Sequence, residues 1–159
     1  MSKLSRDELI AGFIAAVRAS QTATELLDHS VAEYLGLDGS AYRALDILDQ
    51  EGPMTAGRLA ERARLSPGAI TALVDRLEER GLARRTRDEE DRRRVLVEVT
   101  PELRRRAAEL YGTPEEGAGA LAKFSDQELE FLTGFMRGSV AWQEERMRRL
   151  EAIKAKERA

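Results

Sequence analysis

Apolar positions recur every three or four residues along both ends of the chain, which is the spacing of an amphipathic helix. The first pattern follows a capping box, Ser5 to Glu8, and Gly36 and Gly39 end it, so we expect a helix over roughly residues 6–36. Its apolar positions are Leu9, Phe13, Val17, Leu27, Val31 and Tyr34. The second pattern follows another capping box, Ser125 to Glu128. Its apolar positions are Leu129, Leu132, Phe135, Met136, Val140, Met147, Leu150 and Ile153.

Three shorter helices are predicted between these ends. Ser40 is the expected N-cap of the first, which stops at Gly52-Pro53. Thr55 is expected to cap the second. After a turn at residues 64–65, Ser66 caps the third, and Pro67 suits its first helical position because the missing N–H had no partner there. Gly81 ends this helix.

The pattern then changes to a period of two, which predicts a β-hairpin. Val95, Val97 and Val99 alternate with Arg94, Leu96 and Glu98, and residues 83–86 are the expected antiparallel partner. The charged stretch 87–93 is the loop between them. Thr100-Pro101 starts a fifth helix, and the glycines between residues 112 and 119 interrupt the helical pattern before the last one. The predicted fold is mainly α, four helices, a hairpin wing and two more helices.

The length and composition fit one domain that needs a partner. The chain has 159 residues, of which 42% are hydrophobic, and one such chain offers no obvious surface to bury both long terminal helices. It has no cysteine, which excludes disulfides, thiolate metal sites and thiol-based redox sensing. No apolar run approaches the roughly 20 residues of a membrane span. Residues 1–8 are polar and lack a signal-peptide core, so a cytoplasmic protein is expected.

The charge distribution favours nucleic acid, although the formal net charge is −3. Between Arg58 and Arg94 the chain has eleven arginines and eight acidic residues, so this segment is locally positive. Arginine makes bidentate contacts with phosphate and guanine. The third and fourth helices with the hairpin form a winged helix-turn-helix, whose second helix can enter the major groove of DNA. The hairpin arginines suit the backbone or the negative minor groove.

The stretch from Leu59 to Thr100 closely resembles the MarR (multiple antibiotic resistance regulator) family. The residues that resemble it are Leu59-Ala60, Ser66-Pro67, the run 73–78 to Gly81-Leu82, and the wing pattern of Arg85, Asp91, Arg93 and Val99-Thr100. Val99 stands where that pattern usually has leucine. The resemblance implies a six-helix, winged homodimer, with residues 5–36 and 101–155 as dimerisation helices and residues 40–100 as the DNA-binding lobe.

The resemblance also implies which residues meet DNA. Arg93 would insert at the wing tip with Asp91 holding its guanidinium, and Arg85 would brace a phosphate. Ala72 stands where the family often has a long polar or basic residue, which predicts a different operator preference. The full predicted DNA-binding set is Thr55, Ser66, Pro67, Gly68, Ala69, Thr71, Ala72, Arg76, Arg85, Asp91, Arg92 and Arg93.

Proteins similar to this family often bind a small effector, commonly a phenolic or other lipophilic anion, between the dimerisation helices and the DNA-binding lobe. The candidate pocket residues are His29, Tyr34, Tyr42 and Arg43; the alternative is that they pack the junction of the first two helices. We expect no metal and no cofactor, because the single histidine has no partners at metal-ligand spacing and no Gly-rich phosphate loop is present.

The expected function is a dimeric, ligand-responsive repressor that binds a palindromic operator. An enzyme is not expected, because no nucleophile–base pair or metal cluster is present. The remaining alternative is a winged-helix adaptor that binds proteins and not DNA. The arginine pattern at the hairpin tip argues against such an adaptor.

Overall fold

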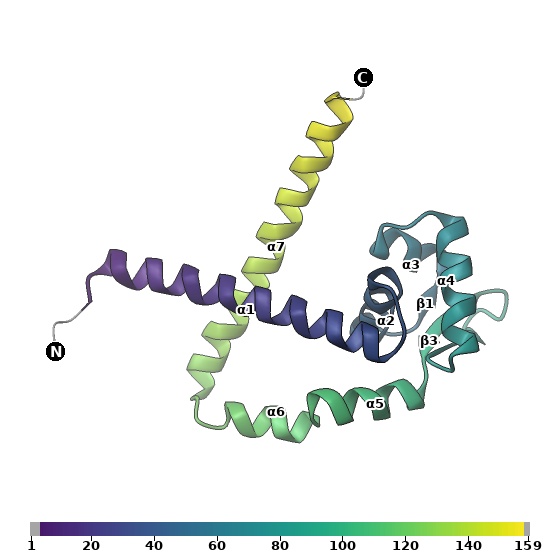
Figure 1. Ribbon diagram of the computed structural model, residues 1–159, viewed down its shortest axis with the longest axis horizontal. Helices are drawn as coiled ribbons and strands as arrows, with labels where there is room; N and C mark the ends of the chain where they lie inside the picture. Colours follow the sequence, from purple (N-terminus) through teal and green to yellow (C-terminus); the bar gives the residue numbers. More distant parts are fainter. Residues whose placement is uncertain (1–3, 158–159) are drawn as a thin grey trace. The chain divides into compact units, whose positions relative to one another are not determined.

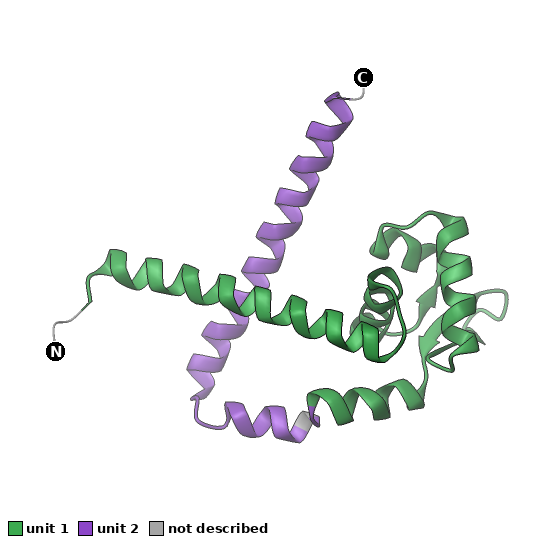
Figure 2. Cartoon of the chain, in the orientation of Figure 1, with its two compact units in different colours: residues 1–111 green, residues 112–159 purple. Residues whose placement is uncertain are grey.

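The computed structural model describes residues 4–157, except the side chain at position 114. The chain divides into two compact units, residues 1–111 and residues 112–159 (Figure 2). The first unit holds the predicted winged helix-turn-helix and the helix before it. The second unit holds the C-terminal helices.

The described part of the first unit, residues 4–111, contains five helices and a three-stranded antiparallel sheet (Figure 1). Its elements are α1 (Arg6–Tyr34), α2 (Gly39–Glu51), β1 (Met54–Thr55), α3 (Ala56–Ala63), α4 (Pro67–Glu79), β2 (Ala83–Arg87), β3 (Val95–Val99) and α5 (Pro101–Tyr111). The strand order is β1-β3-β2, and Ala83 pairs with Val99. The predicted winged helix-turn-helix, with its hairpin over residues 83–99, is therefore confirmed.

The core of this unit lies between α2, α3, α4 and the sheet. Ile70, Leu73, Val74 and Leu77 recur at helical spacing along α4, and all four are buried. Leu48 of α2 and Leu59 of α3 are also fully enclosed in the same cluster. On β3, Val97 and Val99 are buried, whereas Val95 is exposed because it lies at the loop end of the hairpin. The core thus fixes α4 and the hairpin to one scaffold.

The strand β1 was not predicted. Met54 and Thr55 pair with Val97 and Leu96 on β3, and Met54 is buried in the core. Two residues are too few to show a period-two pattern in a sequence. The pairing attaches the start of α3 to the sheet.

Side-chain caps define the starts of the short helices. The hydroxyls of Thr55 and Ser66 accept hydrogen bonds from the backbone N–H of Arg58 (3.3 Å) and Ala69 (3.2 Å), as the sequence predicts. The prediction that Ser40 caps α2 is wrong. Asp38 is the cap, and its Oδ1 accepts from the backbone N–H of both Ser40 and Ala41 at 2.9 Å. The Asp38 carboxylate is favoured over the Ser40 hydroxyl as the N-cap because it also interacts favourably with the positive end of the helix dipole.

Asp38→Ala is expected to lower the free energy of unfolding by about 1 kcal/mol, the usual contribution of an N-cap. The hydrogen bond from the Ala41 N–H lowers the pKa of the Asp38 carboxyl, and so does the Arg76 guanidinium. Burial raises it, but the pKa still lies below its usual value. Because the pKa of Asp38 is lower in the folded protein than in the unfolded chain, where it is about 3.9, the ionised carboxylate stabilises the folded protein at pH values above about 3.9. This stabilisation is lost as the pH falls through the folded-state pKa. Urea denaturation at pH 7 and at pH 3 measures both effects.

Ser40→Ala is the matched control for this prediction, and its unfolding midpoint should equal that of the wild type. Equal losses for the two variants at pH 7 would contradict the assignment of the cap to Asp38. A loss for Asp38→Ala that persists unchanged at pH 3 would show that the carboxylate charge makes no contribution.

The second unit contains two helices, α6 (Pro114–Leu121) and α7 (Asp126–Glu157). The prediction of two helices after the hairpin is therefore wrong, since α5, α6 and α7 follow it. Thr113 and Glu116 form a capping box, in which the Thr113 N–H donates to Glu116 at 2.8 Å. This cap and Pro114 at the first helical position start α6 in spite of Gly117 and Gly119, each of which costs only about 1 kcal/mol relative to alanine.

Both long helices expose apolar side chains. In the second unit, no described residue of α7 is buried, and its exposed side chains include Phe131, Met136 and Leu150. In the first unit, Ile10, Phe13 and Ile14 lie on one face of α1 and are about half exposed. Helices of stable monomers bury such stripes, and large exposed apolar patches mark protein interfaces.

Candidate nucleic-acid interface

The first turn of α4 presents an uncharged surface of small residues. Ser66, Pro67, Gly68 and Ala69 are all exposed, as are Thr71 and Ala72 one turn later. The Thr71 hydroxyl donates to the Pro67 carbonyl at 3.0 Å, and the residue is exposed. Because these side chains are short, the backbone of the helix can approach the edges of base pairs in the major groove. A threonine methyl group can also make an apolar contact with the thymine methyl group there.

Gly68 has no packing reason to be glycine. A Cβ at this position would meet nothing within 4 Å, and its φ is not in the left-handed region. Glycine nevertheless destabilises a helix by roughly 0.5–1 kcal/mol relative to alanine. Glycine at position 68 lowers the stability of the helix and is not required by any neighbouring atom of the protein. Such a glycine suits a position where another molecule comes close to the backbone.

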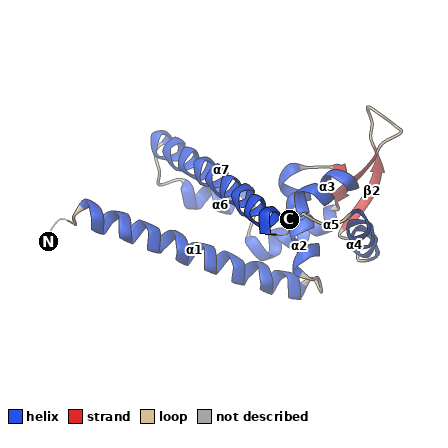
Figure 3. Ribbon diagram, turned by 90° about the horizontal axis from the view of Figure 1, so that it is seen from above, coloured by secondary structure: helices blue, strands red, loops and turns tan. Residues whose placement is uncertain are grey.

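The loop between β2 and β3 is ordered by two aspartates and extends beyond the helices of the unit (Figure 3). Asp88 accepts from the Glu90 N–H at 3.0 Å, and its other oxygen lies 3.5 Å from Arg94. Asp91 accepts from the Arg93 N–H at 3.1 Å and from Arg93 Nε at 3.4 Å. The predicted Asp91–Arg93 contact is therefore present in the structure, and the part played by Asp88 was not predicted.

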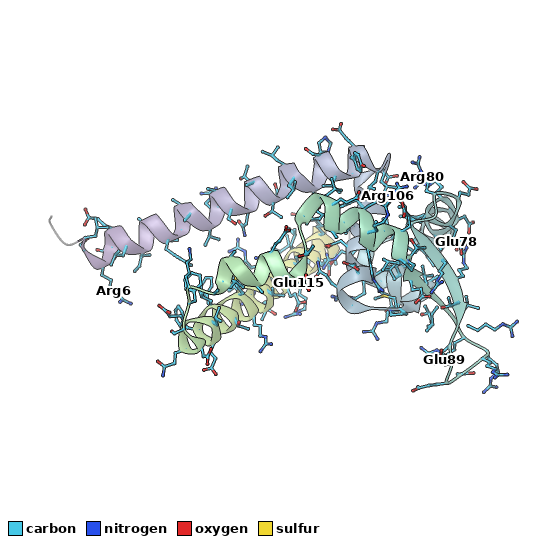
Figure 4. The ribbon with its side chains drawn as sticks, turned by 90° about the horizontal axis from the view of Figure 1, so that it is seen from below. Arg6, Glu78, Arg80, Glu89, Arg106 and Glu115 are labelled. Atoms are coloured by element: carbon cyan, nitrogen blue, oxygen red, sulfur yellow. The ribbon has the colours of Figure 1, made fainter. Side chains whose placement is uncertain are left out.

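The two predicted arginines at the loop are directed outward. The Arg93 side chain is 94% exposed, and Arg92 beside it is also exposed. A guanidinium held at its base by Asp91 but open at its tip can meet phosphate oxygens or a narrow minor groove. Figure 4 marks Glu89 in the same loop, so the tip carries both signs of charge.

Arg85 is placed differently from its neighbours in the predicted set. Its guanidinium bonds two carboxylates of α4, Asp75 at 2.7 Å and Glu78, and its backbone N–H donates to Glu78 at 2.7 Å. The side chain is 31% exposed. In this structure Arg85 joins the wing to α4, the helix that the sequence predicts to enter the major groove and that is called the recognition helix below. The two elements are thereby held in one geometry. The expected phosphate contact of Arg85 remains a prediction.

Two arginines on one face of α4 contact the end of α1 and the start of α2. Arg76 Nη2 bonds Asp38 at 3.1 Å, and Arg80 Nη1 donates to the Leu35 carbonyl at 3.2 Å. Figure 4 marks Arg80 and Glu78 on the same helix. A Cβ at Gly36, where φ is +64°, would lie 2.5 Å from Arg80 Nη1, so glycine is needed there both for the backbone and for the guanidinium. These contacts join α4 to the C-cap of α1 and to the N-cap of α2.

A cavity of about 280 Å³ lies between α1, α2 and α5 in the first unit. Val31, Leu35, Leu45 and Leu103 supply apolar walls, and Tyr42 is the one predicted pocket residue that lines it. His29 and Arg43 line a neighbouring hollow, which Tyr42 also borders. Tyr34 is 65% exposed and lines neither hollow.

Neither a metal site nor a membrane span is found in the described part of the chain. Among residues 4–157, no three His, Asp or Glu side chains are grouped to hold a metal ion. No helix in the same range is long and apolar enough to cross a bilayer. The other residues predicted to meet DNA, Thr55 and Arg76, are occupied as a helix cap and as the partner of Asp38.

Known proteins that resemble this chain decide its family. A sequence profile of the MarR family matches residues 37–95. The uncharacterised HTH-type transcriptional regulator YcgE of Bacillus subtilis is 35% identical over 148 residues, which are 92% of this chain and 96% of that protein. This chain belongs to the MarR family.

Two further relatives agree with this assignment. The HTH-type transcriptional repressor MdtR of Bacillus subtilis is 29% identical over 62% of this chain and 63% of its own length. The solved structure of a MarR family protein from Bacillus stearothermophilus covers 89% of this chain and 99% of that chain, with a TM-score of 0.57 and 23% identity, and so shows the fold. MarR family transcriptional regulators are non-enzymatic DNA-binding regulators. This MarR family protein is therefore a DNA-binding regulator.

Gly68→Ala tests how close DNA comes to α4. Because the new methyl group has open space in the free protein, we expect an unfolding free energy equal to the wild type or up to about 0.5 kcal/mol higher. We also expect DNA affinity to fall about tenfold, since one lost close contact is worth roughly 1–3 kcal/mol. Urea denaturation and fluorescence anisotropy measure the two quantities. Gly39→Ala, in equally open space at the start of α2, should leave affinity unchanged.

Proposed function

We propose that this MarR family regulator binds an inverted-repeat operator as a homodimer and represses the adjacent promoter. The observation that supports this most directly is the exposed first turn of α4 beside a wing whose Asp91 orients Arg93. A pair of such lobes related by two-fold symmetry would read two half-sites about one DNA turn apart. A regulator seated across a promoter in this way excludes the polymerase. Since the protein would bind promoter DNA, the proposal also places it in the cytoplasm.

We further propose that residues 5–36 and 101–155 build the dimer and residues 40–100 the DNA-binding lobe. The exposed apolar faces of α1 and α7 support the first part, because a second copy of the chain would remove them from water. The buried cluster of α2, α3, α4 and the sheet supports the second. MarR family regulators function as dimers, which agrees with this assignment.

A small effector is proposed to bind the cavity between α1, α2 and α5 and to weaken DNA binding. The cavity wall includes Val31 and Leu35 near the end of α1. The Leu35 carbonyl accepts from Arg80 and Asp38 at the start of α2 bonds Arg76, so a shift of α1 or α2 would reach the recognition helix through these two contacts. An effector that prefers a different spacing of the two recognition helices would shift the population away from the DNA-bound form.

A mobility-shift titration with the DNA upstream of the protein's own gene tests the DNA-binding part. We expect a shifted complex whose affinity falls steeply with salt, because several phosphates are neutralised on binding. Thr71→Ala should relax sequence choice more than it weakens non-specific binding. A chain that shifts no duplex at low salt would instead be the winged-helix adaptor.

A further inference from the structure

The polar end of the α1–α2–α5 cavity is a chain of three hydrogen-bonded side chains. Tyr42 of α2 donates its hydroxyl proton to Asp28 of α1 at 3.0 Å, and the hydroxyls of Tyr42 and Tyr111 lie 2.6 Å apart. A phenol has a single proton. Since Tyr42 gives its proton to Asp28, Tyr111 must be the donor in the second bond. The Tyr111 proton is therefore donated to the Tyr42 oxygen, and the Tyr42 proton to the Asp28 carboxylate.

At this end of the cavity a ligand therefore meets hydrogen-bond acceptors and no hydrogen-bond donors from these three side chains. Burial, followed by the bonds with Tyr111 and Asp28, raises the pKa of Tyr42, so its phenol stays protonated at any physiological pH. The lone pairs of the two phenols and the second oxygen of Asp28 are then the groups open to a ligand at this end. The faces of both rings also carry negative charge, which attracts a cation.

Three carboxylates, Asp28, Asp46 and Asp49, and two guanidinium groups, Arg104 and Arg106, line the cavity, so its wall carries a net negative charge. Asp28 and Asp46 line both the cavity and its neighbouring hollow. The described cations of the cavity wall already face carboxylates, since Arg104 lies 3.8 Å from Asp49 and Arg106 lies 2.7 Å from Glu102. Arg105 and Arg106 lower the pKa of Glu102 to about 2, so that carboxylate remains charged beside them. Arg43 borders only the neighbouring hollow.

We propose that this cavity selects a small aromatic cation, whose charged group lies against Asp28 and the two tyrosine rings and whose ring lies on the apolar wall. The proposal rests on the effector role proposed above and names the chemical class of the effector. The family resemblance led us to expect a phenolic or lipophilic anion, and the carboxylates of this chain favour the opposite charge. A volume of about 280 Å³ suits a ligand with one aromatic ring.

Two probes of equal shape test the proposal on the full-length protein. Benzyltrimethylammonium and neopentylbenzene differ in one atom and in charge, and salicylate represents the phenolic anions. Calorimetric titration should give binding of the cation at least tenfold tighter than binding of either other probe. The cation should also weaken the operator complex in a mobility shift.

Asp28→Asn keeps the shape of the side chain and removes its charge, and it should weaken binding of the cation about tenfold or more. Tyr42→Phe removes the hydroxyl that orients Asp28 and should have a smaller effect of the same sign. Asp7→Asn, the same change in the first turn of α1, is the matched control and should bind the cation as the wild type does.

The outcomes separate this inference from the proposed function. Tighter binding of salicylate, equal binding of the two isosteric probes, no binding of the cation, or an Asp28→Asn protein that binds the cation normally would each overturn the inference, while DNA binding without ligand would still support the regulator. Failure of the wild type to bind its operator without any ligand would contradict the proposed function and leave the charge selectivity of the cavity to be judged by calorimetry alone.

Discussion

Replacing Ile10 and Ile14 with glutamate is expected to convert the protein to a monomer and to reduce operator affinity at least about 100-fold. The two side chains are about half exposed in the single chain and lie one helical turn apart on α1, next to Phe13. In the proposed dimer a second chain would cover them, and an unpaired carboxylate buried there costs several kcal/mol. Loss of the second lobe also removes the gain of bivalent binding, which is roughly 100- to 10,000-fold.

Analytical ultracentrifugation and anisotropy with operator DNA measure these two effects. Ala15→Glu/Ala19→Glu places the same charges, with the same spacing, on the far side of α1 and serves as the control. Circular dichroism should show no loss of helix in either variant, because all four positions are exposed in the single chain. If the Ile10→Glu/Ile14→Glu protein forms a dimer as stable as the wild type, this face of α1 is not part of the dimer interface and the prediction is wrong.

Arg93→Ala is expected to weaken operator binding about 10- to 100-fold and to reduce the dependence of affinity on salt. The side chain is 94% exposed and contributes no internal packing, so its loss should leave the folded protein intact. Each phosphate contact contributes about one unit to the slope of log affinity against log salt concentration, and a dimer has two wings. We therefore expect the slope to fall by about two. Anisotropy titrations at several salt concentrations provide this measurement.

Arg105→Ala is the control for that experiment, because it removes an equal charge from α5. Arg105 is bonded there to Glu102 at 2.9 Å and to Glu109, away from the wing and from the first turn of α4. Its affinity and salt slope should match those of the wild type. An unchanged slope for Arg93→Ala would show that the wing tip does not meet the DNA backbone.

The sequence predicted the winged lobe well because its signals are local. Ser66-Pro67 marks the start of α4 within two residues, and the recurrence of valine at every second position, Val95, Val97 and Val99, marks β3. The buried stripe of α4 follows from its helical period alone. The contact between Asp91 and Arg93 spans two positions, so it too could be expected from the motif.

The features that escaped prediction depend on contacts between distant residues or on competition between neighbouring ones. Arg85 reaches back to Asp75 and Glu78, and nothing in the hairpin pattern indicates which arginine of the wing is neutralised in this way. Tyr42 and Tyr111 are 69 positions apart and meet only in the fold. Asp38 and Ser40 are both good N-caps two residues apart, and the choice between them depends on Arg76 of α4 and on the backbone path after Gly36.

A hydroxyl-radical footprint of the upstream DNA tests the central claim most directly. If two lobes each place α4 in a major groove and Arg93 beside it, the wild type will protect two symmetric patches whose centres lie about 10–10.5 base pairs, or a multiple of that, apart. Arg93→Ala should lose the outer part of each patch and keep its centre. A single asymmetric patch, or no protection at a protein concentration that saturates the mobility shift, would contradict the account.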